Sequence, residues 1–212
     1  MIIYTCVTNN DTLHPVQETG KHYCYTNRSM SQDGWDCLPL ENTEKDNART
    51  ARWHKTQADI LKNKETIWID GKVELLQNLY WFYKHLKTYD LVLLKHPKRN
   101  CIYEEAKKVI EIGKAPPRLV LEQVEKYQKS NMPSNFGLFE TCIIGRKANL
   151  PLNDLWWNEI KNHSHRDQIS LPFLLYKYEV KTKIIEININ DNPYFKIHHH
   201  PFKDHSQDIL LL

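Results

Sequence analysis

Glycine is scarce in this chain, which has only six glycines among 212 residues. The glycine-rich phosphate loops G-x-x-x-x-G-K-[ST] and G-x-G-x-x-G do not occur in the sequence, and neither does the nucleophile elbow G-x-S-x-G. A backbone cradle for phosphate is therefore not expected. If the protein binds a phosphorylated ligand, side chains and a bound cation have to balance the negative charge.

Other signals are also missing. The five cysteines include no C-x-x-C pair, which favours small buried side chains in a reducing compartment over a zinc site. No apolar run approaches the roughly 20 residues that cross a bilayer, and the opening MIIYTCVTNN is too short for a signal peptide. We therefore expect a cytoplasmic protein without a membrane span. A net charge of +3 is far below that of a dedicated nucleic-acid binder, so we expect no nucleic-acid partner.

Strand-like and helix-like segments alternate along the chain. Patterns of β-branched and aromatic residues predict strands at 2–8, 22–27, 66–70, 90–96, 138–145 and 183–190. Helical periodicity predicts helices at 47–63, 75–86, 101–112, 119–130, 150–163 and 166–178, and residues 28–46 look irregular. This alternation predicts an α/β fold of Rossmann-like type, with a central mixed, mainly parallel sheet flanked by helices.

The length suits one domain over residues 1–212, in which residues 183–212 form a last strand and a His-rich tail. The apolar finish at 208–212 is compatible with a fragment that continues into a further domain. In a parallel sheet, ligands lie beyond the carboxyl ends of the strands. That rule directs attention to Thr8, Asp70 and His96, each at or just beyond the end of a predicted strand.

The strand predicted at 66–70 ends in a carboxylate. Asp70 follows an apolar run, and Gly71 lets the backbone turn tightly there. A carboxylate in this position suits a divalent cation that neutralises a diphosphate. A simple strand-end turn explains the same pair of residues.

Polar residues mark the start of the helix predicted at 166–178. Arg166, Asp167 and Gln168 can cap the helix, or they can bind sugar hydroxyls through directional hydrogen bonds. The sequence leaves both interpretations open.

Histidines gather near the C-terminus, where His198, His199 and His200 are followed by His205. Neutral imidazole is a common ligand of transition metals, and His198 and His200 would face one side of an extended segment. A solvated tail is the alternative.

Basic side chains form two clusters. Arg52 and Lys55 are three residues apart and share a face of the predicted helix, with Arg49 nearby. They can hold phosphates or a nucleobase, or they can form a merely solvated face. The second cluster contains Lys95, His96, Lys98 and Arg99.

Several short segments occur in the order found in one known family. They are MIIYTCVTNN, YCYTN, GWD, ARTARWHK, IWIDG, KHPKRNCIYEEA, QVEKY, FGLFETCIIGRK, LWWNEI and RDQISL. The chain resembles, over about residues 1–180, a glycosyltransferase-like family first catalogued as a domain of unknown function. Members occur in plant Golgi proteins, in bacteria and in large algal viruses. A viral member would act in the host cytoplasm.

This resemblance implies a GT-A fold, a nucleotide-sugar donor and usually Mn²⁺ or Mg²⁺. GT-A enzymes hold the metal through a D-x-D motif, whose place here is taken by Asp70-Gly71-Lys72, without the second carboxylate. The resemblance therefore implies that His198 or His200 supplies another metal ligand.

The resemblance also implies roles around the donor. Thr5, Val7 and Thr8 would border the base and ribose, and Arg52 and Lys55 would approach the nucleotide. The segment Arg166, Asp167 and Gln168 would face the transferred sugar.

The expected reaction moves a hexose or deoxyhexose, of glucose or rhamnose type, from a UDP-sugar to a hydroxyl of a glycan or glycoprotein acceptor. Uridine is expected because it is common among GT-A donors. The metal, held by Asp70 and a tail histidine, would stabilise the departing diphosphate. Asp167 would be the carboxylate nearest the reacting carbon, as a base if the reaction inverts or as a positioning group if it retains.

Three alternatives compete with this prediction. A non-catalytic carbohydrate-binding module would use some of the six Trp and eleven Tyr to stack on sugars, but Trp81, Trp156 and Trp157 lie in helical patterns that favour core packing. A pseudoenzyme would keep the fold after losing the second carboxylate. A metal-dependent hydrolase would use Asp70, His96 and the histidine tail.

Overall fold

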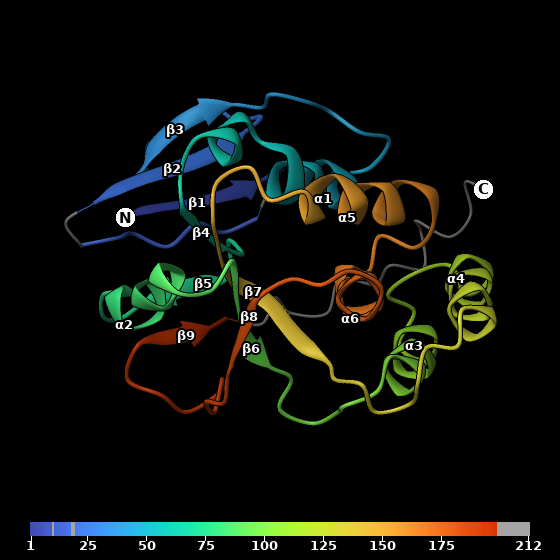
Figure 1. Cartoon of the computed structure of the whole chain (residues 1–212). Helices are drawn as coiled ribbons and strands as arrows, with labels where there is room; N and C mark the ends of the chain where they lie inside the picture. The colour runs from blue at the N-terminus through green and yellow to red at the C-terminus, as the bar shows by residue number, and fades with distance from the viewer. Residues whose placement is uncertain (10, 18–19, 199–212) are drawn as a thin grey trace.

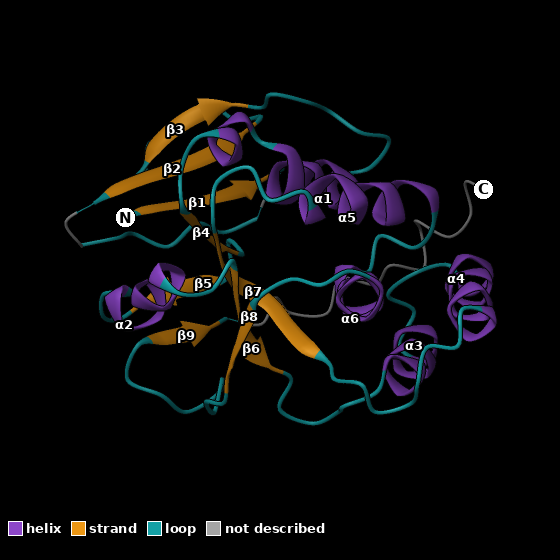
Figure 2. Ribbon diagram, in the orientation of Figure 1, coloured by secondary structure: helices purple, strands orange, loops and turns teal. Residues whose placement is uncertain are grey.

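A single large sheet organises the protein, in a computed structural model that describes residues 1–9, 11–17 and 20–198. In these residues seven strands pair in the order β3-β2-β1-β4-β7-β6-β8, and all except β7 run in the same direction. The result confirms the predicted α/β fold with a mixed, mainly parallel sheet (Figure 2). In sheet order the strands are β3 (Asp36–Pro39), β2 (Lys21–Thr26), β1 (Ile2–Val7), β4 (Thr66–Ile69), β7 (Phe139–Arg146), β6 (Leu91–Lys95) and β8 (Thr182–Ile185).

The two faces of this sheet are covered differently. Five helices pack on one face: α1 (Asn47–Gln57), α3 (Ile102–Glu111), α4 (Pro117–Lys129), α5 (Leu152–Asn162) and α6 (Asp167–Lys177). The other face is covered by the short helix α2 (Tyr80–Tyr83) and a small second sheet of β5 (Val73–Leu75) and β9 (Phe195–Ile197). Figure 1 shows these two sets on opposite sides of the strands. Each face of the sheet packs against its own cluster of buried apolar side chains, so the sheet lies between two hydrophobic clusters.

Local sequence explains the main elements. All four residues of β4 are buried, as expected for a strand covered on both faces. Helix α1 starts after Asp46, whose side chain accepts a hydrogen bond from the backbone N–H of Arg49. Helix α4 has Pro117 at its first position, where no backbone donor is needed.

The predicted boundaries are wrong by more than two residues in four places. The helix predicted at 47–63 ends at Gln57, because Ala58 leaves the helical conformation, and a separate 3-10 turn follows at Asp59–Lys62. Residues 28–46 contain the strand β3, which was expected to be irregular. The helix predicted at 75–86 begins later, as α2 with a 3-10 turn at Lys84–Lys87, because Leu75 pairs with Phe195 in the small sheet. The strand predicted at 183–190 ends at Ile185, and Asn188 and Asn192 make local turn hydrogen bonds beyond it.

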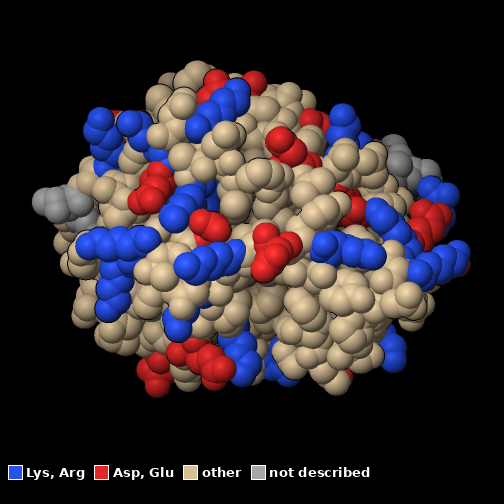
Figure 3. Space-filling model, viewed as in Figure 1, with Lys and Arg blue, Asp and Glu red and all other residues tan. Residues whose placement is uncertain are grey.

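Charge is dispersed on the surface. Figure 3 shows Lys and Arg interspersed with Asp and Glu over the face in view. Within the described ranges, no helix has the length and apolar character needed to cross a membrane.

Candidate functional site

The antiparallel strand β7 shapes one edge of the sheet. Strands β1, β4 and β6 end at this edge, whereas β7 begins there, because it runs in the opposite direction to β4 and β6. The backbone N–H of Asp70 donates to the carbonyl of Cys142 at 2.8 Å. The edge therefore brings Asp70, just beyond β4, next to the first residues of β7.

A buried lysine joins two carboxylates at this edge. Lys55 Nζ, whose side chain is fully buried, lies 2.6 Å from Asp167 Oδ2 and 3.2 Å from Asp70 Oδ1. Trp68 Nε1 also donates to Asp70 Oδ1, at 2.8 Å, and Lys55 Nζ lies 5.3 Å from the centre of the Trp68 ring. Residues from α1, β4 and the start of α6 are thus held together around one ammonium group.

Asp167 is the most enclosed acid of this group. Its carboxylate also accepts a hydrogen bond from Thr141 Oγ1 at 3.0 Å and forms an ion pair with Arg52 Nε at 3.0 Å. Burial alone would raise the pKa of Asp167, but Arg52, Lys55 and Arg166 together hold it well below its ordinary value. The predicted shared face of Arg52 and Lys55 is confirmed, because both reach the same carboxylate oxygen, and it is not a solvated face.

Asp70 is more accessible than Asp167. Its side chain is 18% exposed, and within the described part of the chain its second oxygen, Oδ2, accepts no hydrogen bond. Burial opposes ionisation, but Lys55, Arg52 and Lys72 lower the pKa of Asp70 below its ordinary value. Asp70 therefore offers one ionised oxygen that is free to bind a cation.

Cationic side chains converge on this edge from several elements. Burial lowers the pKa of Lys114, and the nearby charges of Arg166 and Lys72 lower it further. Burial likewise lowers the pKa of Arg166. Its Nη2 donates to Gln168, while its buried Nε has no hydrogen-bond partner among the residues that the structure describes. Positive side chains that repel one another, together with a buried N–H donor that has no acceptor, favour the binding of an anion.

Glu140 is a second accessible carboxylate at this edge. It accepts a hydrogen bond from Gln168 Nε2 at 3.2 Å, and its Oε1 lies 3.5 Å from His96 Nε2. Burial raises its pKa above 4.5, against the lowering effect of Lys72 and with the added repulsion of Asp70. Its environment therefore favours the protonated form far more than that of Asp167 does.

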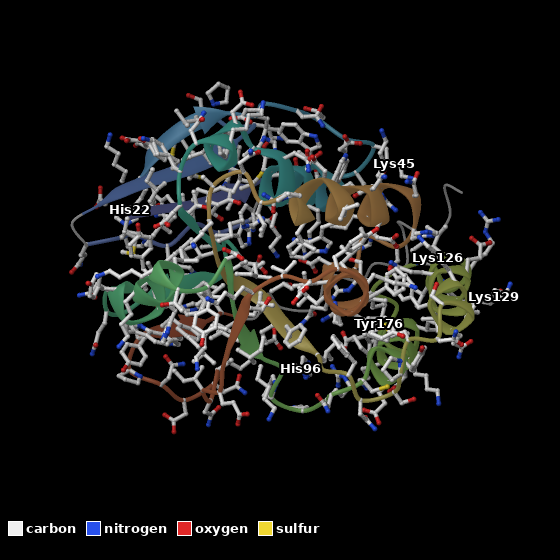
Figure 4. The ribbon with its side chains drawn as sticks, in the orientation of Figure 1. His22, Lys45, His96, Lys126, Lys129 and Tyr176 are labelled. Atoms are coloured by element: carbon white, nitrogen blue, oxygen red, sulfur yellow. The ribbon has the colours of Figure 1, made fainter. Side chains whose placement is uncertain are left out.

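His96 lies at the same edge, directly after the last residue of β6. Figure 4 labels it near the end of that strand. Its Nδ1 accepts hydrogen bonds from the backbone of Lys98 and Arg99, and burial together with the Arg99 charge lowers its pKa. Arg99 in turn pairs with Glu105 at 2.6 Å, and Lys95 pairs with Glu186 at 2.9 Å.

The residues expected to border the nucleotide lie along and beyond β1. Thr5, Val7 and Thr8 are almost completely buried, and Thr5 Oγ1 has no hydrogen-bond partner in the described part of the chain. A Cβ on Gly71 would lie 2.5 Å from Val7 Cγ1, so this position requires glycine because the two segments approach closely. Their contact with a nucleotide stays a prediction.

His198 lies beside the small sheet, next to Lys72 and Glu74. Its backbone N–H donates to the carbonyl of Lys72 at 2.9 Å, and its Nε2 lies 2.7 Å from Glu74 Oε2. Among the described residues, the three-residue group placed to share a metal ion contains His14, Glu74 and His198 but not Asp70. His200 lies outside the described residues.

Sequence reasoning missed Glu140, Thr141 and Lys114 as parts of the site. Glu140 and Thr141 lie at the start of a strand, and a rule based on the carboxyl ends of parallel strands overlooks them. Knowing that β7 is antiparallel would have identified both residues. Lys114 follows Gly113, at the end of α3, and no local pattern marks it.

Comparison with known proteins agrees with the predicted resemblance. The family model described as TOD1/MUCI70, glycosyltransferase-like domain, matches residues 25–200. The chain is also 28% identical over 132 residues to an Arabidopsis thaliana protein named "Probable hexosyltransferase MUCI70". The match covers 55% of this chain but only 22% of that relative, so the chain spans a small part of the larger protein. The length of the family match shows that this chain belongs to the TOD1/MUCI70 glycosyltransferase-like domain family.

Proposed function

We propose that the chain is a glycosyltransferase domain of GT-A type that transfers a hexose or deoxyhexose, of glucose or rhamnose type, from a UDP-sugar to a hydroxyl of a glycan acceptor. The observation that carries this proposal is the meeting of the free Asp70 oxygen with a group of cations at the carboxyl edge of the sheet. Nucleoside diphosphates need both a cation and positive side chains. The family, and the hexosyltransferase name of the relative, support the same class of reaction.

The residues at this edge fit a divalent cation such as Mn²⁺ or Mg²⁺. Asp70 Oδ2 would be a protein ligand, and the diphosphate and water would complete an oxygen-rich shell. When bound, such an ion acts as a Lewis acid toward the leaving diphosphate. A contribution of His200 to the same ion remains a prediction, whereas the contacts of His198 in this structure are with Glu74 and Lys72.

The diphosphate would lie against the cations that border Asp70. The charges of Arg166 and Lys72 lower the pKa of Lys114, and among the described residues the buried Nε of Arg166 has no acceptor, which a phosphate oxygen could supply. Lys55 is committed to two carboxylates, so we assign it to holding Asp70 and Asp167 in place.

Glu140 fits the role of proton acceptor better than Asp167. The carboxylate of Asp167 is 1% exposed and paired with cations, which lowers its basicity. Glu140 is 16% exposed and its pKa is raised by burial, so it retains more affinity for a proton. Gln168 bridges the two, since its backbone N–H donates to Asp167 and its side chain donates to Glu140.

The experiment is a measurement of UDP release from a panel of UDP-sugars with Mn²⁺ and glycan acceptors. We expect D70N to lose at least about 100-fold in turnover, the size of effect seen when one transition-state contact is removed. E140Q should lose about 10²- to 10⁴-fold while UDP affinity stays unchanged. E186Q is the matched control, because Glu186 is an exposed carboxylate that forms an ion pair with the surface residue Lys95, and it should keep full activity.

Two outcomes would refute the proposal. Undiminished metal-dependent turnover in D70N would remove Asp70 from the donor site. Thermal stabilisation by glycans alone, without any effect of UDP and Mn²⁺, would instead identify a carbohydrate-binding module.

A further inference from the structure

Three metal-binding side chains converge on the face of the molecule that carries the small sheet. The ligand atoms of His14, Glu74 and His198 all lie within 4.8 Å of one another. The rings of His14 and His198 stack with their centres 4.1 Å apart, and Glu74 Oε2 lies 2.7 Å from His198 Nε2. We propose that these three residues form a binding site for a divalent transition-metal ion, and that Asp70 is not part of it.

The three residues come from separate segments whose backbones are fixed. The carbonyl of His14 accepts a hydrogen bond from Trp35 Nε1 at 2.8 Å. Glu74 lies in the middle of β5, opposite Lys196 of β9, and the N–H of His198 binds the carbonyl of Lys72 at 2.9 Å. The donors are therefore brought together by the fold rather than by neighbouring positions in the sequence.

The donor set selects the class of metal. Two imidazoles and one carboxylate suit Zn²⁺, Co²⁺ and similar ions, whereas Mg²⁺ and Ca²⁺ prefer shells made of oxygen. Donors bound tetrahedrally at about 2.1 Å from a metal lie about 3.4 Å apart. Small side-chain rotations from the present separations reach that spacing. The side chains of His198 and Glu74 are 36% and 33% exposed, which leaves room for water as a further ligand.

A simple hydrogen bond between Glu74 and His198 is the competing explanation. It accounts for the 2.7 Å contact and for the lowered pKa of Glu74, to which His198 contributes most. In that explanation His14 acts on Glu74 through its charge, whereas a metal site needs the His14 ring nitrogen as a ligand. The part played by His14 in metal affinity therefore separates the two explanations.

A metal at this position would tie the segment between β1 and β2 to the small sheet. His14 lies in that segment, and the carbonyl of Thr12 in the same segment would lie 3.2 Å from a Cβ on Gly71. The segment thus packs against the turn that carries Asp70. A bound ion would hold this wall of the proposed donor site in place without taking part in the reaction there.

The test is a titration of the metal-free full chain with Co²⁺ in the absence of nucleotide, followed by visible absorption and equilibrium dialysis. We expect one ion bound with the spectrum of a four- or five-coordinate nitrogen and oxygen site. H14A, E74Q and H198A should each weaken Co²⁺ binding by more than about 10-fold. Loss of a residue that only supports a metal ligand already weakens metal binding by about 10-fold, and loss of a ligand should weaken it more. D70N, and the tail double variant H199A/H200A, should bind Co²⁺ as the wild type does.

E74Q keeps the size of the side chain, and far-UV circular dichroism of each metal-free variant checks that it folds. Unchanged Co²⁺ affinity in a folded H14A would overturn the proposal. Loss of the site in D70N or in H199A/H200A would also overturn it, because the ion would then lie at the donor site or on the tail. Since no nucleotide is present, this result is independent of whether the chain transfers sugar.

Discussion

Two clusters of charged side chains contain similar chemical groups, but one cluster is buried and the other is partly exposed to solvent. The cluster around Asp167 is buried, with the side chains of Lys55 and Asp167 at 0% and 1% exposure. The cluster around Glu74 is about one third exposed. A buried ion pair is costly to break, because the remaining charge has no water to solvate it, whereas an exposed pair contributes little. The buried cluster around Asp167 therefore contributes to the stability of the fold, whereas the partly exposed cluster around Glu74 can bind a ligand.

Their locations extend this contrast. The buried cluster lies at the edge of the main sheet, on the side covered by five helices, and joins α1 to α6. The exposed cluster joins a loop to the small sheet on the other side. Gly71 lies between them in the chain, directly after Asp70 and shortly before Glu74. Substitutions in the three places should separate effects on stability from effects on ligand binding.

The largest expected effect on stability comes from D167A. It removes the carboxylate that pairs with both Lys55 and Arg52, and leaves Lys55 paired with Asp70. We expect the free energy of unfolding to fall by about 3–5 kcal/mol, measured by urea denaturation. D59A is the control, since Asp59 and Lys62 form an exposed pair, and it should change stability by less than about 1 kcal/mol. Equal effects of the two variants would contradict the contrast.

The next effect is the acid dependence of stability. Because the pKa of Asp167 is lower in the folded chain than its ordinary value of 3.8, the folded state binds fewer protons. Its stabilising contribution is fully present above that value and is lost as the pH falls toward the folded pKa. Urea denaturation of wild type and D167N between pH 5 and pH 2 should show a steeper loss for the wild type. Parallel curves would mean that Asp167 carries no depressed pKa.

A smaller effect is expected for G71A. The added methyl group would lie 2.5 Å from Val7 Cγ1 and force the turn away from β1. We expect about 1–3 kcal/mol of destabilisation, as for other overpacked sites, together with weaker UDP binding because Asp70 moves. Urea denaturation and a UDP titration measure the two effects, and unchanged UDP affinity in a destabilised G71A would argue against the placement of Asp70.

The smallest effect is expected for E74Q in metal-free protein. Glu74 and His198 form a partly exposed pair, so the change in the free energy of unfolding should be below about 1 kcal/mol. Thermal unfolding of the metal-free proteins measures it. A larger loss would show that the exposed cluster is structural, like the buried one.

The sequence predicted the parts of the site that depend on local pattern. Arg52 and Lys55 are three residues apart on a helix, and the strand before Asp70 is strongly apolar, so their positions followed from periodicity. Burial of Trp156 also followed from its helical pattern. The alternating apolar segments likewise predicted the class of the fold.

The missed parts depend on pairing between distant segments. Strands β5 and β9 are three residues each, and neither has a recognisable pattern without its partner. Glu140 lies at the site because β7 is antiparallel to β4 and β6. The alternation of apolar and polar residues that predicts a strand does not predict the direction in which the strand runs. His14 and Glu74 meet His198 through the same long-range pairing, which a view of the tail alone could not identify.

The most direct test of the central claim is a calorimetric titration of the chain with UDP, with and without Mn²⁺, in the wild type and in D70N. If Asp70 holds the cation of the donor site, the wild type binds UDP more tightly with Mn²⁺, and D70N loses at least about 10-fold in UDP affinity, or 1.4 kcal/mol. UDP binding that is equal in D70N, or that does not respond to Mn²⁺, would contradict a donor site built on Asp70.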